Sequence, residues 1–243
     1  MMRAIDILKA AEGIKFKDQD GEVDELELLP PLNDAELRQL ESQIPCPLPE
    51  DVRQFLLYCR GFEGVLESID FSGGLTAGFG MEEIFPHAIP IAHDGFGNYW
   101  IVDLTKESTN WKPIFFACHD APVIVFQTES LAHFISEVIR FGNPPWKSEI
   151  DDVHEKHHFR IWKENPGMLS YAECIDSGDA DLVNFARSLG EDFLICDLRN
   201  PRVGDGFSWG RYGPQAVLKR HGDKRIFAYQ IRPSLWQRLF KKN

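Results

Sequence analysis

Histidines and acids gather in one short part of the sequence at a spacing that could bind a metal ion. Four of them follow one another at i, i+3, i+6 and i+7: Asp151, His154, His157 and His158. On a helix, several of these side chains would share one face, and imidazole and carboxylate groups are zinc ligands. Cys174 is a conceivable further ligand. A polar surface helix accounts for the same residues, so we expect no bound metal and no cofactor, with a metal-dependent hydrolase using His154, His157 and His158 as the alternative.

Two other groups have residue types that catalysis uses. Cys118-His119-Asp120 contains a nucleophile, a base and an orienting acid, but adjacent residues of a strand point to opposite faces and do not assemble a triad. Glu82, Glu83 and Asp94 could line a cleft as paired carboxylates, although the sequence fixes no separation between them. We interpret these three acids as a solvated rim and as candidate partner-binding residues, and we predict no catalytic residue.

The elements that would position these groups are organised around Ile89–Leu104. Asp94-Gly95 and Gly97-Asn98 tolerate positive φ, and Tyr99–Val102 is aromatic and β-branched, which predicts a β-hairpin. Strand alternation divides the second strand into Trp100, Val102 and Leu104 on one face and Tyr99, Ile101 and Asp103 on the other. Because both faces are mostly apolar, we expect an interior strand with Trp100 in the core.

Periodicity and capping residues predict the remaining elements. Helices are expected at Ala4–Glu12, from Asn33 to about Ser42 with Glu36 completing a capping box, from Pro49 to Gly61, from a Thr128 cap to near Gly142, and at Asp179–Leu189. Strands are expected at Val65–Phe71, Pro113–Cys118, Val123–Gln127, Asp192–Asp197 and Ile226–Ile231. The glycine-rich segment Gly73–Gly80 fits no nucleotide-binding pattern. Short links between consecutive strands predict an α+β fold, an antiparallel meander sheet flanked by helices.

The best boundary in the chain is Gly142–Pro145, because consecutive prolines cannot continue a helix. We therefore predict one domain over residues 1–142 and a C-terminal α+β extension over residues 143–243. The last segment, Pro233–Asn243, is predicted to be a short helix docked on the protein. A membrane-surface element acting through its basic side chains is the alternative.

Charge and cysteine content limit the classes of partner. The net charge is −12, and the eight basic residues and single acid from Lys219 onward leave −19 on the rest of the chain. Such a field repels nucleic acid and attracts basic partners. Five cysteines without a CxxC pair fit reduced thiols in a cytoplasmic protein. The sequence has no uncharged apolar run of about 18 residues, so we expect no membrane span.

The order of these elements resembles a known family. The acidic helix, the following LPEDVRQFLLYCRGFEG, the IPIAHDGFGNYWIVDL hairpin, the strands around Ala121-Pro122-Val123 and the closing amphipathic helix are similar to the SUKH superfamily, the Smi/Knr-type immunity and cell-wall-regulator fold, over about residues 24–142. This resemblance implies a non-enzymatic protein-binding module, with a basic toxin or nuclease domain as the expected partner of an immunity protein. No residue pattern specifies the partner's identity or an oligomeric state.

Overall fold

The predicted hairpin is the centre of the fold. The computed structural model describes residues 3–17, 20–64, 68–70, 79–210 and 217–231. Strands β6 (Ala88–His93) and β7 (Tyr99–Asp103) pair antiparallel around the glycine-containing loop. They are followed by β8 (Ile114–Cys118) and β9 (Val123–Thr128), each antiparallel to the strand before it. The prediction of an antiparallel meander within an α+β fold is confirmed.

The meander is part of an eight-stranded sheet of order β12-β9-β8-β7-β6-β5-β4-β3. Its outer strands on one side are β3 (Glu27–Leu28), β4 (Gly61–Glu63) and β5 (Ser68–Asp70). On the other side, β12 (Gly206–Ser208) comes from far along the chain and pairs with β9. A Cβ on Gly206 would lie only 1.9 Å from the Ile124 carbonyl oxygen, so a glycine is required at this strand contact. The sequence patterns did not predict β12.

Helices of the first half follow the predictions closely. They are α1 (Ala4–Ala11), α2 (Asp34–Gln43), α3 (Glu50–Tyr58) and α4 (Leu131–Phe141). Asn33 and Glu36 form the predicted capping box at α2. The predicted Thr128 cap of α4 is wrong, because Thr128 is held in β9 opposite Ile114 and the Ser130 side chain accepts from the His133 N–H instead. Because Thr128 is the last paired residue of the strand, the helix cap is supplied by a residue that follows the strand.

One face of the large sheet packs on helices. Trp100, Val102, Phe116 and Val125 project from this face into a core shared with α1, α3 and α4. The predicted burial of Trp100 is confirmed, and Phe55 on α3 is buried in the same core. A continuous helical segment lies over the same face near β9, and its parts are α5 (Glu149–Asp151), the π-helix η2 (Asp152–His157) and α6 (His158–Glu164).

The opposite face of the large sheet is covered by a second, four-stranded sheet. Its strand order is β10-β11-β14-β13. The strands are β10 (Met168–Leu169), β11 (Phe193–Asp197), β13 (Leu218–Arg220) and β14 (Ile226–Gln230). Phe227 and Tyr229 of this sheet enter one core with Ile101, Phe115 and Phe126 of the large sheet. The two faces of β7 are thus buried in two different cores, as its alternation predicted.

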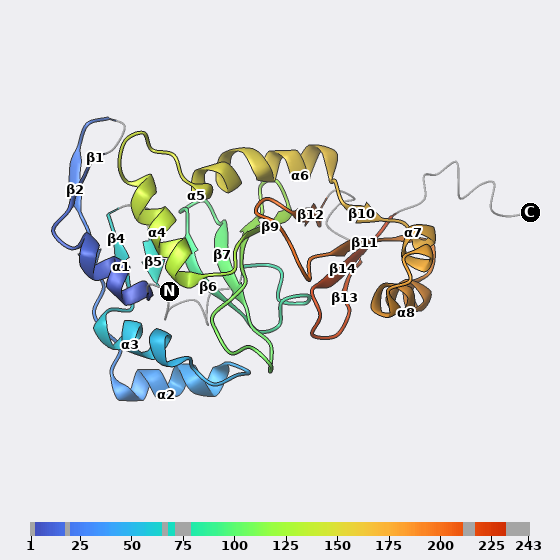
Figure 1. Ribbon diagram of the computed structural model, residues 1–243, viewed down its shortest axis with the longest axis horizontal. Helices are drawn as coiled ribbons and strands as arrows, with labels where there is room; N and C mark the ends of the chain where they lie inside the picture. The colour runs from blue at the N-terminus through green and yellow to red at the C-terminus, as the bar shows by residue number, and fades with distance from the viewer. Residues whose placement is uncertain (1–2, 18–19, 65–67, 71–78, 211–216, 232–243) are drawn as a thin grey trace, which may run out of the picture.

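Two more helices close the second sheet on its outer side. They are α7 (Tyr171–Asp176) and α8 (Ala180–Leu189), and α8 confirms the helix predicted at Asp179–Leu189. A third core lies between these helices and β11 and β14. The order of layers is helices, large sheet, small sheet, helices, and Figure 1 shows α7 and α8 at one end of the molecule beside the small sheet. A separate two-stranded ribbon is made by β1 (Lys15–Lys17) and β2 (Val23–Glu25).

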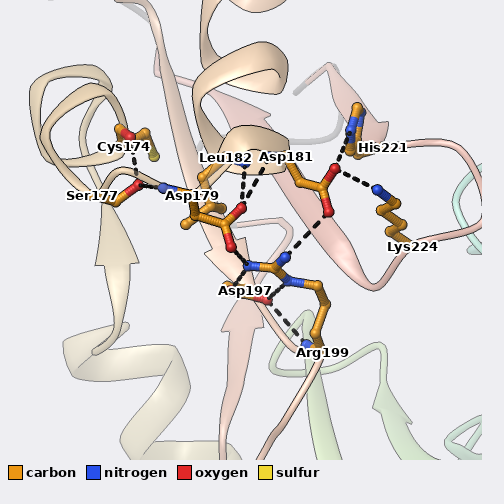
Figure 2. A network of polar contacts seen from close by, with 9 residues as sticks. All are labelled: Cys174, Ser177, Asp179, Asp181, Leu182, Asp197, Arg199, His221 and Lys224. Atoms are coloured by element: carbon orange, nitrogen blue, oxygen red, sulfur yellow. Dashed lines mark hydrogen bonds and ion pairs between the residues drawn. The ribbon is translucent and has the colours of Figure 1, made fainter.

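A polar network fastens α8 to the small sheet. Arg199, just after β11, donates to Asp179 at 2.9 Å and to Asp197 at 2.7 Å, and Figure 2 shows its guanidinium lying between these acids. Asp181, in the first turn of α8, pairs with Lys224 from the β13–β14 turn. The hydrogen bond from Arg199 lowers the pKa of Asp179, and the one from Lys224 lowers the pKa of Asp181. These acids are therefore ionised and neutralised by cations within the protein.

A second charged cluster joins the two sheets. Asp103, at the end of β7, is fully buried and accepts from the two terminal nitrogens of Arg220 at 2.8 and 2.9 Å. Arg225 adds a third hydrogen bond to Asp103 at 2.9 Å. Part of the basic C-terminal region is consequently used inside the molecule, where it compensates a carboxylate that neither apolar core could hold alone.

Several predictions lie partly or wholly outside the described residues. Of the strand expected at Val65–Phe71, the structure describes β5. The glycine-rich segment from residue 73 to 78 and the helix expected at Pro233–Asn243 fall outside the described ranges. The division into residues 1–142 and 143–243 stays a prediction. The segment after residue 142 contributes β12 to the large sheet and covers one face of that sheet.

Candidate functional site

The loop that joins β6 to β7 is held in one shape by the side chains at its two ends. Asp94 Oδ1 accepts from the backbone N–H of Phe96 at 2.9 Å and of Asn98 at 3.2 Å, and its Oδ2 accepts from the Asn98 amide at 2.7 Å. Asp and Asn side chains close turns in this way. Gly95 and Gly97 have φ values of 76° and 87°, which residues with a Cβ rarely adopt. The loop is therefore firmly shaped, and Phe96 stands at its tip.

The helix that follows residue 151 fixes the same loop from another side. His154 Nε2 lies 3.0 Å from Asp94 Oδ2, and the imidazole stacks on Trp100 with ring centroids 6.0 Å apart. Burial alone would raise the pKa of Asp94, but hydrogen bonds from Asn98 and His154 outweigh burial and hold that pKa below its ordinary value. Asp94 is thus an ionised, internally bonded group that joins two segments sixty residues apart.

The β8–β9 turn supports the loop from a third side. The Asn98 side-chain oxygen accepts from the His119 backbone N–H at 2.9 Å. A Cβ on Gly97 would lie 3.1 Å from the His119 ring, so the glycine also permits close packing here. Next to this contact, Cys118 is buried, and burial raises the pKa of its thiol. A protonated, enclosed thiol is a poor nucleophile, and His119 beside it supports the loop through its backbone N–H.

The histidine-rich segment carries a stronger metal signal than its helical spacing alone. Residues 154–158 read His-Glu-Lys-His-His, which fits the HExxH pattern of zinc proteases. In the structure, His157 packs against Gly204, while the rings of His154 and His158 lie 6.1 Å apart on the side of the loop. Glu155, the general base of such proteases, instead contacts His154 Nδ1 at 2.6 Å. In the described part of the chain, no three His, Cys, Asp or Glu side chains form a group that could hold a metal ion.

The remaining ligand candidate from the sequence lies elsewhere. Cys174 is fully buried in the core beneath α7, among Leu182, Phe185 and Ile195. Burial raises the pKa of this thiol as well. The structure therefore places His154 next to Asp94 and His158 next to His154, and it separates His157 and Cys174 from them.

An open groove of about 360 Å³ lies between the loop and the helix. Aromatic side chains dominate its walls: Phe96, Phe116, Phe159 and Trp162. Phe96 is 70% exposed and Phe159 is 46% exposed, which is unusual for large apolar side chains. Two acids stand at the groove with largely exposed side chains, Asp120 from the β8–β9 turn and Glu155 from η2. Rigidly held, exposed aromatics beside charged groups are typical of protein-binding surfaces.

The comparisons with known proteins identify the part of the chain that carries the loop. Residues 31–137 match the model of the SMI1 / KNR4 family (SUKH-1). This match confirms that the segment resembles the SUKH superfamily. No curated protein and no solved structure matches the chain. Among the described residues, no helix is both long and apolar enough to cross a membrane.

The groove lies at the edge of the SUKH segment. Its Asp94–Asn98 loop and Asp120 lie inside residues 31–137, whereas His154, Glu155 and Phe159 follow that segment. The fold of the SUKH segment thus supplies one wall, and the added helix supplies the other. Sequence reasoning missed Phe96 and Phe159 as site residues. The signal for Phe96 was available, since a phenylalanine between two turn glycines has no neighbouring strand to pack against.

The three acids predicted as partner-binding residues do not come together. Glu82 and Glu83 are exposed and precede β6, while Asp94 follows it, so the six residues of that strand, about 20 Å in length, separate them. Glu82 accepts from the backbone N–H of Phe79 at 2.8 Å. Asp94 is largely enclosed by its own hydrogen bonds. A paired-carboxylate arrangement of these residues is therefore not formed.

Proposed function

We propose that this protein is a non-enzymatic protein-binding module, and specifically an immunity protein that binds and blocks a toxin domain in the cytoplasm. The SUKH segment supports this reading, because SUKH-type proteins of bacteria include many that neutralise secreted toxins by binding them. Five free, buried cysteines are consistent with a reducing compartment.

The observation that carries the proposal is the presentation of Phe96. A large apolar side chain that is 70% exposed contributes little to the core, yet the bonds of Asp94, Asn98 and His154 hold its loop in one conformation. A preorganised aromatic group loses little conformational freedom when a partner covers it. Aromatic anchors of this kind supply much of the binding energy in protein interfaces. We therefore assign the partner contact to the groove between Phe96 and Phe159.

The acids predicted earlier take different roles in this proposal. Asp94 shapes the loop, because its oxygens are already bonded within the protein. Glu82 and Glu83 are a second possible contact region, with exposed charge that would draw a basic toxin or nuclease domain toward the protein. Nucleic acid would be repelled by the same charge.

Co-expression with the toxin domains encoded beside the gene tests the proposal. We expect one of them to form a stable complex and to lose toxicity in its presence. Phe96→Ala should weaken that complex at least about tenfold, as loss of an interface anchor does. Leu57→Ala is the matched control, since Leu57 is an exposed apolar residue on α3 that does not line the groove. If no neighbouring toxin binds, the immunity proposal is wrong. If Phe96→Ala and Leu57→Ala have equal effects, the groove is not the contact.

The competing hydrolase hypothesis has its own test. Elemental analysis of protein purified without an affinity tag should detect no stoichiometric zinc, manganese or iron, because His154 is bonded both to Glu155 and to Asp94 of the loop. If the protein contains stoichiometric zinc and a His158→Ala variant loses it, residues 154–158 bind zinc as an HExxH motif does, and a purely binding role is contradicted.

A further inference from the structure

The groove between the Asp94–Asn98 loop and α6 combines aromatic walls with acidic side chains. Its walls are aromatic, and of its polar residues none is a lysine or an arginine. Asp120 and Glu155 line it from two separate elements, with side chains that are 69% and 57% exposed. The chain as a whole carries −12. An apolar surface that has acids at its border and neither lysine nor arginine in its lining favours an occupant that is apolar along its length and positive at its end.

We infer that the groove binds an arginine or lysine side chain of the protein partner, an inference that rests on the proposed protein-binding function. The stem of such a side chain would lie against Phe96 and Phe159, and its cationic end would reach Asp120 and Glu155. Long basic side chains combine an apolar stem with a charged end, and cations bind favourably to the faces of aromatic rings. Arginine suits the site best, because its planar guanidinium can stack on a ring and donate to carboxylates together.

Both acids have an oxygen available for a ligand. Asp120 Oδ1 lies 3.3 Å from His119 Nε2, and Glu155 Oε1 lies 2.6 Å from His154 Nδ1. Within the described ranges, the second carboxylate oxygen of each residue makes no hydrogen bond or ion pair. The carboxylates are thus oriented by neighbouring histidines while one acceptor on each stays open to solvent. An apolar or anionic side chain placed here would leave these acceptors desolvated without a donor, which is unfavourable.

Phe159 already takes part in an interaction of the expected kind. Lys163 Nζ lies 5.8 Å from the centroid of the Phe159 ring, within the range of a cation–π contact. The size of the groove also fits a side chain. Its volume of about 360 Å³ is near the lower end of the range of small-molecule pockets, about 300–1,000 Å³. One long side chain enters such a space and leaves room beside it for neighbouring atoms of the partner, whereas a folded segment has to rest on the border of the groove.

The experiment uses short peptides, so it needs no identified partner. An acetylated Gly-Arg-Gly amide, its lysine counterpart and its citrulline counterpart are titrated into the isotope-labelled full chain, and backbone amide shifts are followed. Citrulline has nearly the shape of arginine without the charge. We expect saturable shifts at residues 94–98, 119–121 and 154–162 with the arginine peptide, with a dissociation constant on the order of 1 mM, and at least tenfold weaker binding of the citrulline peptide. Added salt should weaken binding further.

Charge-reversal variants show whether the two acids are responsible. Asp120→Lys with Glu155→Lys should abolish the saturable shifts. The control, Asp24→Lys with Glu191→Lys, changes the net charge equally at exposed acids that do not line the groove and should bind as the unchanged protein does. The amide spectrum of each variant, recorded before peptide is added, verifies that the variant is folded.

The outcomes separate this inference from the proposed function. Equal binding of the arginine and citrulline peptides, equal loss in both double variants, or no saturable shift with either basic peptide would overturn the inference. If a toxin complex forms and depends on Phe96 while the peptides fail, the inference alone is wrong. If the peptides bind at the groove and no toxin forms a complex, the immunity proposal fails and the cation site remains.

Discussion

The buried charge cluster between the two sheets should contribute strongly to stability, and a mutant cycle can measure it. Asp103 is completely buried and Arg220 is 7% exposed, with paired hydrogen bonds of 2.8 and 2.9 Å. Asp103→Ala leaves the guanidinium of Arg220 enclosed without its carboxylate. Removing one partner of a buried ion pair costs about 3–5 kcal/mol. Because Arg225 is more exposed and can reach solvent, we expect the loss to come mainly from Arg220.

Arg220→Ala should cost less than Asp103→Ala, since Arg225 still pairs with the carboxylate. Arg220 also packs over the rings of Phe85 and Phe227, so its single variant loses ring contacts as well as charge. Comparison of the double variant, Asp103→Ala with Arg220→Ala, with the two single variants removes the contribution that each residue makes independently of the other. The coupling free energy between Asp103 and Arg220 should then be about 2–3 kcal/mol, at the upper end of measured pairwise values.

Urea unfolding followed by circular dichroism supplies the four free energies of unfolding. A matched control exists in the same chain, because Arg3 and Asp6 form a two-bond pair with distances of 2.8 and 2.9 Å between side chains that are 58% and 43% exposed. The same cycle on Arg3 and Asp6 should give only a small coupling, since exposed pairs are solvated. Equal coupling in the two cycles, or a loss below about 1 kcal/mol for Asp103→Ala, would refute the argument that burial makes this cluster important.

Three further predictions concern the loop and its surroundings. Trp100→Ala should lower the free energy of unfolding by about 3–5 kcal/mol in urea titrations, because the indole is enclosed in the main core, and a loss below about 1 kcal/mol would place it at the surface. Phe96→Ala should change that free energy by no more than about 0.5 kcal/mol, since its ring is mostly in solvent; a larger loss would mean that Phe96 has a structural role. Burial and the nearby His154 lower the pKa of His158 in the folded protein. As the pH falls below about 6.5, the His158 imidazole is therefore protonated in the unfolded chain before it is protonated in the folded protein. Stability should therefore decrease from about pH 6.5 downward until the folded protein is also protonated, and His158→Gln should reduce that slope; an unchanged slope contradicts the assignment.

Local sequence signals predicted the elements that are stabilised locally. The Asn33–Glu36 capping box, the helix at Asp179–Leu189 and the glycine-containing turn after Asp94 each depend on residues within a few positions of one another, and each forms as expected. Along β7, alternate residues point to opposite faces of the strand, and both sets are mostly apolar, which predicted that both faces are buried. These features need no knowledge of distant residues.

The groove could not be predicted in the same way. Its two walls meet through the contact of Asp94 with His154, and no local pattern connects residues so far apart. The π-helical turn at Asp152–His157 also changes which histidines share a face, so a regular helical spacing placed His157 wrongly beside the others. β12 has three residues and becomes a strand only because β9 offers it an edge.

The way the second part of the chain covers the first bears on the predicted boundary near Gly142. A chain ending there would lose β12 and the small sheet, and it would expose Ile101, Phe115 and Phe126 of the large sheet. Asp103 would also lose both of its arginines. We therefore expect this shortened chain to bind a hydrophobic dye and to unfold without a sharp transition, whereas a chain ending at Ile231, which keeps every described strand and helix, should unfold cooperatively. Cooperative unfolding of residues 1–142 with the stability of the whole protein would instead mean that the core between the sheets contributes little, and that residue 142 ends an independent domain.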